Sequence, residues 1–192
     1  MSFPVLGRTV CVTQARMTSS RLPGKILMTA AGKPLLQWHL ERLLACAHVD
    51  QVALATTVNA TDDPAAELAE SLGVFVFRGS EHDVLGRFAG CVEAVGGETA
   101  IRVTADCPLI DPALIDALVD RFAAGRGETP PPDYASIDVS TLPRGLDAEI
   151  FTAAALRAAA TEGVEPFERE HVTPFIYRRP DRFPHNLPQN TV

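Results

Sequence analysis

The segment from Gln14 to Lys25, QARMTSSRLPGK, gathers side chains that bind anions. Three cations and two serine hydroxyls lie within it: Arg16, Arg21, Lys25, Ser19 and Ser20. No Asp or Glu precedes Glu41 in the chain, so these cations have no acidic neighbour in sequence. Arginine grips phosphate oxygens in pairs, lysine adds a compact charge, and a Pro-Gly turn brings backbone N–H groups close to the same ligand. The segment predicts a polyphosphate site, and a solvated basic loop is the alternative.

Two familiar phosphate-binding motifs are excluded. A Walker loop requires glycine five residues before its Gly-Lys pair, but Ser19 occupies that position for Gly24-Lys25 and Leu27 occupies it for Gly32-Lys33. No GxGxxG follows a strand candidate, which excludes the dinucleotide-binding fingerprint.

Composition limits the class of protein and its partners. The chain has 192 residues, 46% of them hydrophobic, with a net charge of -7 and a pI of about 5.2, which fits one folded domain. An acidic chain without a long Lys/Arg run is a poor candidate for binding nucleic acid, so we expect no nucleic-acid partner. No signal peptide or membrane span is expected, so we predict a cytoplasmic protein. The four scattered cysteines form no CxxC pair and indicate neither zinc nor disulfides.

The elements that must position the cations alternate along the chain. Four apolar strands are predicted, at 9–13, 51–56, 74–77 and 100–104, with helical periodicity at 35–44, 65–72 and 84–95 between them. Asp111-Pro112 predicts the start of a further helix that ends near Ala123. This order is typical of an α/β fold with a mostly parallel sheet covered by helices on both faces. Ligands of such sheets bind beyond the carboxyl ends of the strands, where the Gln14–Lys25 segment follows its strand.

The second part of the chain follows a break in composition. The segment GRGETPPPD, residues 125–133, is rich in Gly and Pro and predicts a loop. Strands are predicted at 134–137 and 148–151, a helix from about Thr152, and another helix over 167–177.

The whole string ARMTSSRLPGK resembles the first loop of the sugar-acid cytidylyltransferases, which include the CMP-Kdo and CMP-sialic acid synthetases. The resemblance continues through AGKPLLQWHLERL, ATTVNATDD, VFRGSEHDVLGRF, RVTADCPLIDP, GLDAEIF and FEREHVTP, and so covers nearly the full chain. It is close to the branch named for spore coat polysaccharide biosynthesis protein F.

The resemblance implies a three-layer α/β/α nucleotidyltransferase fold, GT-A-like and Rossmann-like. It further implies one domain over 1–192, with a nucleotide-binding part at about 1–124 and an acceptor and dimerisation part at about 133–178. The implied reaction transfers CMP from CTP to a sugar acid and releases pyrophosphate, in a homodimer that serves surface polysaccharide or glycan synthesis.

The resemblance also assigns nucleotide-binding residues by position. Arg16 and Lys25 take the catalytic, triphosphate-holding roles, and Ser19 contacts phosphate or a metal-bound water, with Ser20 and Arg21 as weaker candidates. Arg78 falls where the family recognises cytosine, and a surface arginine that closes its strand is the alternative. Thr104 lies near the base or ribose.

Asp106, in TADCP, is the carboxylate that the resemblance assigns to Mg2+ and catalysis. Magnesium keeps several waters and needs only one or two protein carboxylates when it bridges phosphates, so a single Asp is chemically sufficient to begin such a site. The alternative is an Asp that caps a turn before Pro108.

The acceptor sugar is assigned to Asp147, Glu149 and His171. Asp147 and Glu149 are two residues apart, so in an extended segment they project from one face. Solvated charges at a hairpin edge are the alternative for the two carboxylates, and a surface histidine is the alternative for His171.

One feature departs from the family pattern. Members normally continue with a strand Thr-Val-Asp, whose Asp is a second metal ligand, whereas this sequence ends NTV at Val192. We therefore expect a shortened chain or a variant with reduced catalysis, and keep a nucleotide-binding or partner-binding relative as the alternative function. A glycosyltransferase is a third possibility, but its usual DxD-type motif is not present in TADCP.

Overall fold

The computed structural model of the protein describes residues 6–19, 22–138, 140 and 142–185. These residues form a six-stranded sheet in the order β5-β4-β1-β6-β8-β7 and a small β2-β3 hairpin. The strands of the large sheet are β1 Thr9–Gln14, β4 Gln51–Thr57, β5 Phe75–Gly79, β6 Thr99–Thr104, β7 Tyr134–Ser136 and β8 Glu149–Thr152. The hairpin strands are β2 Thr29–Ala30 and β3 Lys33–Pro34.

The first four strands of the large sheet are parallel, and only β8 and β7 run antiparallel to their neighbours. The predicted mostly parallel sheet is therefore confirmed. The segments that follow β1, β4, β5 and β6 all leave from the same edge of the sheet, because parallel strands end on one side.

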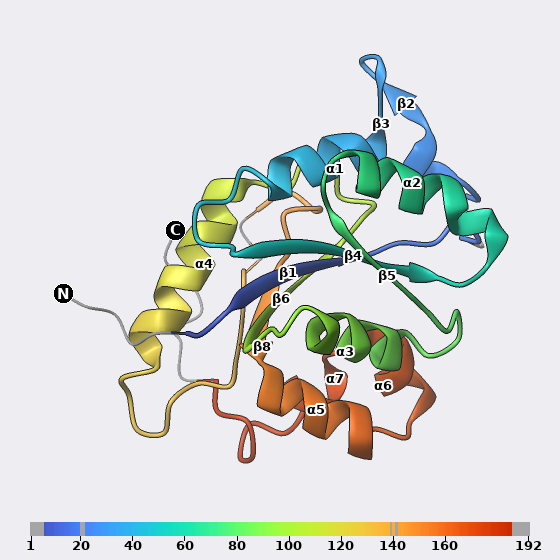
Figure 1. Ribbon diagram of the computed structural model, residues 1–192. Coiled ribbons are helices and arrows are strands. Elements are labelled where there is room, and N and C mark those ends of the chain that lie inside the picture. The colour runs from blue at the N-terminus through green and yellow to red at the C-terminus, as the bar shows by residue number, and fades with distance from the viewer. Residues whose placement is uncertain (1–5, 20–21, 139, 141, 186–192) are drawn as a thin grey trace.

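Helices cover both faces of the sheet (Figure 1). The seven α-helices are α1 Leu35–Leu43, α2 Asp63–Ser71, α3 Val84–Ala94, α4 Pro112–Gly125, α5 Ala153–Glu162, α6 Pro166–His171 and α7 Pro174–Tyr177 within the described part of the chain. Helices α1, α2 and α4 share one apolar core with β1 residue Cys11, whereas α3, α5 and α7 share a second core with Val10 and Val12. Successive side chains of a strand point to opposite faces, so one strand supplies both cores.

Three of the helices begin at a residue whose side chain caps the first turn. Asp83, Asp111 and Thr152 each accept a hydrogen bond from a backbone N–H in the first turn of α3, α4 and α5, at 2.9, 3.0 and 3.1 Å. Such N-caps satisfy donors that the helix itself leaves unpaired. The start predicted for α4 at Asp111-Pro112 is thereby confirmed.

The prediction of one continuous helix over 167–177 is wrong, because the structure has two short helices there. Val172 has a φ of 71° and ends α6, and α7 begins two residues later at Pro174. Proline at position 174 lacks the N–H that a continuous helix would need there, and its ring would clash with the carbonyl group four residues earlier. Thr173 instead donates its hydroxyl to Glu149 at 2.8 Å, so the break supplies a contact in a pocket.

Candidate functional site

Two adjoining pockets open at the carboxyl edge of the parallel strands. The first has a volume of about 450 Å³ and is called here the cationic pocket, because its wall includes Arg16, Ser19, Lys25, Arg87 and Asp106. The second, of about 370 Å³, is called the aromatic pocket, because its wall includes Tyr134, Phe167 and Tyr177 together with Asp147 and Glu149. Both pockets are lined by Arg102, Thr104 and His171, so they adjoin at these residues, and the two together are called the cleft.

Lys25 and Asp106 are joined across the cationic pocket. Gly24, with a φ of 71°, closes the turn by donating its N–H to the Met17 carbonyl at 2.9 Å, and the 3-10 helix Lys25–Leu27 follows. A left-handed φ of this kind is accessible to glycine at little cost. Lys25 Nζ lies 2.5 Å from Asp106 Oδ2. Burial raises the pKa of Asp106, but the hydrogen bond and charge of Lys25 outweigh it, so the pKa is below its ordinary value.

Asp62 anchors the segment that follows β1. This carboxylate is fully buried and accepts the backbone N–H of Met17 at 2.7 Å. It also accepts the Thr56 hydroxyl and the N–H and hydroxyl of Thr57, at the end of β4. One acid therefore ties the residue after Arg16 to the neighbouring strand.

Glu81 places Arg16 at the rim of the pocket. Arg16 Nη1 lies 3.8 Å from Glu81 Oε1, and Glu81 also accepts hydrogen bonds from Thr18 and from Asn59 Nδ2, the latter at 2.7 Å. The hydrogen bond from Thr18, then that from Asn59, hold the pKa of Glu81 below its ordinary value. Because the Arg16 side chain remains 40% exposed, its guanidinium is accessible to a ligand.

His39 of α1 supports the turn that carries Asp106. The ring is fully buried, with Nδ1 2.8 Å from the Cys107 carbonyl oxygen and Nε2 2.9 Å from Thr13 Oγ1. A carbonyl oxygen can only accept, so Nδ1 carries the proton and Nε2 accepts from the Thr13 hydroxyl. The neutral ring thus links α1, β1 and the residue after Asp106.

His39→Gln is expected to reduce the loss of stability in acid. Burial lowers the pKa of His39 from 6.5 to about 4, so between these values the unfolded chain binds a proton that the folded chain does not. Wild-type stability therefore falls as pH drops through this window, and His39 accounts for roughly 3 kcal/mol of that fall by pH 4. Urea denaturation of both proteins at pH 7 and pH 4 measures the difference. Equal acid losses in the two proteins would contradict this role.

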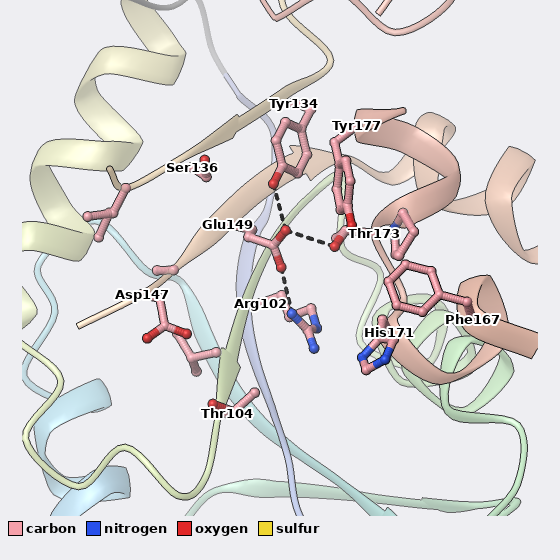
Figure 2. Close-up of a pocket in the computed structure, with 14 residues that line it drawn as sticks. Arg102, Thr104, Tyr134, Ser136, Asp147, Glu149, Phe167, His171, Thr173 and Tyr177 are labelled. Carbon is pink, nitrogen blue, oxygen red and sulfur yellow. Dashed lines mark hydrogen bonds and ion pairs between the residues drawn. The ribbon is translucent and has the colours of Figure 1, made fainter. Parts of the chain in front are cut away.

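Glu149 is the centre of the aromatic pocket (Figure 2). It accepts hydrogen bonds from Tyr134 Oη at 2.6 Å, Thr173 Oγ1 at 2.8 Å and Arg102 Nη1 at 2.6 Å. Burial, and then the Glu149 charge, raise the pKa of Tyr134, which keeps the phenol protonated as a donor. Glu149 therefore fixes the positions of other side chains, whereas Asp147 accepts one backbone N–H, from Gly145 at 3.2 Å, and is more available to a ligand.

The structure brings most of the predicted site residues together. Eight of them line the cleft: Arg16, Ser19, Lys25, Thr104, Asp106, Asp147, Glu149 and His171. Ser20 and Arg21 lie outside the described residues.

Arg78 lines neither pocket. Its guanidinium pairs with Asp63 at 2.6 Å and donates to the carbonyl oxygens of Thr57 and Asn59, each at 2.8 Å. This arrangement matches the alternative of an arginine that closes its strand, and cytosine recognition by Arg78 stays a prediction.

Arg87 and Arg102 line the cleft, although the motifs did not single them out. Both interrupt apolar patterns, since Arg102 lies within the strand sequence AIRVT and Arg87 falls among the buried positions of α3. A charged residue on an otherwise buried face is a signal of a paired or ligand-binding group. That signal was present in the sequence, but only the fold showed which pocket each side chain lines.

Comparison with known proteins assigns the family. The family described as Cytidylyltransferase matches residues 10–192. The chain belongs to this cytidylyltransferase family. It is 35% identical to the spore coat polysaccharide biosynthesis protein SpsF of Bacillus subtilis, over 88% of this chain and 70% of the relative.

Two further relatives extend the comparison. The chain is 35% identical to the 3-deoxy-manno-octulosonate cytidylyltransferase of Synechococcus elongatus over 62% of this chain, which is 48% of that enzyme's length. A solved cytidylyltransferase structure from Leptospira borgpetersenii has a TM-score of 0.87 and 34% identity, over 95% of this chain and 76% of that one. The predicted α/β nucleotidyltransferase fold and the enzyme class are confirmed.

A metal site in this cytidylyltransferase would depend on the substrate as well as on the protein. No cluster of three or more His, Cys, Asp and Glu side chains occurs among the described residues. The Asp106 side chain is 40% exposed and lies beside Lys25 in the cationic pocket. One accessible carboxylate fits a hard cation that takes its other ligands from water and phosphate oxygens.

Among the described residues, no helix has the length and apolar character needed to cross a bilayer.

Proposed function

We propose that this cytidylyltransferase transfers CMP from CTP to a sugar acid and releases pyrophosphate, for the synthesis of a surface polysaccharide or glycan. The adjacency of the two pockets carries the proposal: a cationic pocket with an accessible aspartate adjoins a pocket of hydroxyls, carboxylates and aromatic rings at Arg102, Thr104 and His171. A nucleotide and an acceptor can therefore meet in one cleft. The names of the SpsF relative and of the 3-deoxy-manno-octulosonate cytidylyltransferase support this choice of reaction.

In this reaction a sugar hydroxyl loses its proton, forms a bond to the α-phosphorus of CTP and displaces pyrophosphate. The protein contributes positioning and charge stabilisation more than covalent chemistry. Arg16 and Lys25 bind the triphosphate and offset the charge of the departing pyrophosphate, while Ser19 donates its hydroxyl to a phosphate oxygen. Asp106 holds a divalent cation, for which we propose Mg2+. Such an ion polarises phosphate oxygens and helps to orient the acceptor.

The acceptor occupies the aromatic pocket in this proposal. Asp147 accepts hydrogen bonds from sugar hydroxyls, and His171 contacts the acceptor beside Phe167, whose ring centroid lies 4.5 Å from that of His171. Glu149 orders the pocket by fixing Arg102 and Tyr134. Residues of about 1–124 thus bind the nucleotide, and residues of about 133–178 bind the acceptor within the same domain.

A pyrophosphate-release assay tests the proposal. With CTP and Mg2+, the purified chain is expected to turn over one or more members of a panel of Kdo, sialic, pseudaminic and legionaminic acids. Substitution of CTP by UTP, or removal of the metal by a chelator, should suppress the signal. Tight calorimetric binding of CTP without turnover on any acceptor would contradict the enzyme proposal and favour a nucleotide-binding relative.

We also propose a homodimer in the cytoplasm, where CTP is available. The dimer would use the region after Pro130, and a homogeneous monomer in sedimentation would contradict it.

A further inference from the structure

Arg87 is a buried cation without a carboxylate partner among the described residues. It lies on α3 and is 4% exposed, yet it lines the cationic pocket beside Arg16 and Lys25. Its Nη1 donates to the Ser80 carbonyl, whereas its Nε has no hydrogen-bond partner. Burying a guanidinium without an ion pair is costly, so this arrangement requires a compensating role.

The acids nearest to Arg87 are already bound to other groups. Asp62 accepts from Met17, Thr56 and Thr57. Glu81 accepts from Thr18 and Asn59 and lies beside Arg16, and Asp83 pairs with Arg169. These carboxylates lower the potential around Arg87, but none lies within ion-pair distance of its guanidinium in the described structure.

The backbone is shaped to bring Arg87 close to the end of β5. A Cβ atom on Gly79 would lie 3.0 Å from Arg87 Cγ and 3.2 Å from Arg87 Cβ. Contacts this short require the neighbouring atoms to move, so the absence of a side chain at Gly79 lets the stem of Arg87 pack against the strand. The guanidinium is thereby held at the wall of the pocket.

Two further observations indicate an anion. Burial, and then the nearby charge of Arg16, lower the pKa of Arg87, so its positive charge is disfavoured in the ligand-free site. Lys25 lies 2.5 Å from Asp106 and Arg16 lies 3.8 Å from Glu81, whereas Arg87 lines the same pocket without an ion pair among the described residues. A polyanion between Arg16 and Arg87 would relieve their repulsion and give the Arg87 guanidinium the ion pair that it lacks.

We infer that Arg87 is a third cation of the phosphate-binding site, and that with Arg16 and Lys25 it binds the triphosphate of the nucleotide. The inference rests on the proposed function for the identity of that ligand, but the anion site itself is tested with a simpler probe. Inorganic tripolyphosphate carries the same phosphate chain without nucleoside or acceptor.

Calorimetric titration with tripolyphosphate compares wild type, Arg87→Gln and a matched control, Arg157→Gln. Arg157 is exposed on α5 and lines neither pocket of the cleft. Arg157→Gln therefore removes the same single positive charge as Arg87→Gln, but away from the cleft. Loss of a charge-assisted contact is expected to weaken binding by Arg87→Gln roughly 10- to 100-fold, with little change for Arg157→Gln. Equal affinity in all three folded proteins would overturn the inference.

A wild-type measurement covers the case in which Arg87→Gln does not fold. The Nε–H resonance of Arg87, assigned through bonds to its backbone, should shift as tripolyphosphate is added, and an unchanged resonance at saturation would overturn the inference.

The role of Arg87 and the proposed reaction can be refuted independently. Normal CTP turnover by Arg87→Gln with an unchanged KM would refute the role of Arg87 alone, whereas tripolyphosphate binding without cytidylyl transfer would refute only the proposed reaction.

Discussion

Asp106→Asn is expected to lower the rate of pyrophosphate release from CTP about a hundredfold to a thousandfold, while the protein remains folded. The carboxylate lies just beyond β6, in the pocket that holds Arg16 and Lys25, and is accessible to a metal ion. Asparagine keeps the size of the side chain but loses the charge that a hard cation requires. The size of the effect follows from the loss of a preorganised electrostatic contact in the transition state.

Binding of CTP in the absence of metal distinguishes the loss of a metal-binding carboxylate from a general disruption of the pocket. Because Lys25 Nζ lies 2.5 Å from Asp106 Oδ2, removing the Asp106 charge frees Lys25 for phosphate. Without metal, Asp106→Asn should bind CTP at least as tightly as wild type, whereas Lys25→Ala should bind it more weakly and also lose turnover. Calorimetry with a chelator, beside a pyrophosphate assay with Mg2+, measures both.

Asp120→Asn is the matched control for Asp106→Asn. The substitution removes the same single negative charge as Asp106→Asn. Asp120 lies on α4, where its half-exposed side chain pairs with His48 at 3.0 Å. It should retain wild-type turnover. Wild-type-like turnover by Asp106→Asn or Lys25→Ala would exclude the role assigned to that residue.

Asp62→Ala is expected to lower the free energy of unfolding by about 3 to 5 kcal/mol, because it leaves several buried donors unpaired. Asp62 is fully buried and accepts hydrogen bonds from Met17 N–H and from Thr56 and Thr57. Loss of the Met17 contact also releases the segment that carries Arg16 and Ser19, so KM for CTP should rise in whatever protein remains folded. Urea denaturation gives the first quantity and steady-state kinetics the second.

The neighbouring residue supplies a control for Asp62. Asp63 has a 46% exposed side chain and pairs with Arg78 at the surface. Asp63→Ala should cost about 1 kcal/mol or less, because an exposed ion pair contributes little. Equal losses of stability in Asp62→Ala and Asp63→Ala would show that Asp62 does not anchor the segment that carries Arg16 and Ser19.

Local features of the sequence determined most of the elements and the chemistry of the first loop. Continuous apolar runs predicted β1, β4, β5 and β6, and Asp111-Pro112 predicted the start of α4, because these signals depend on residues close in the chain. The cations of the Gln14–Lys25 segment likewise predicted an anion site without information from any distant residue. The resemblance of the motifs identified the family that the comparisons confirm.

Only the tertiary structure decided which distant side chains meet. The sheet order brings β8 beside β6, so Glu149 binds Arg102 and is less free to bind an acceptor than Asp147. Arg78 is held by Asp63, although its position at a strand end resembled a nucleotide contact. Arg87 lines the cationic pocket because α3 packs against β5, which the sequence around Arg87 did not reveal. Such pairings depend on packing between segments far apart in sequence, which neither periodicity nor spacing encodes.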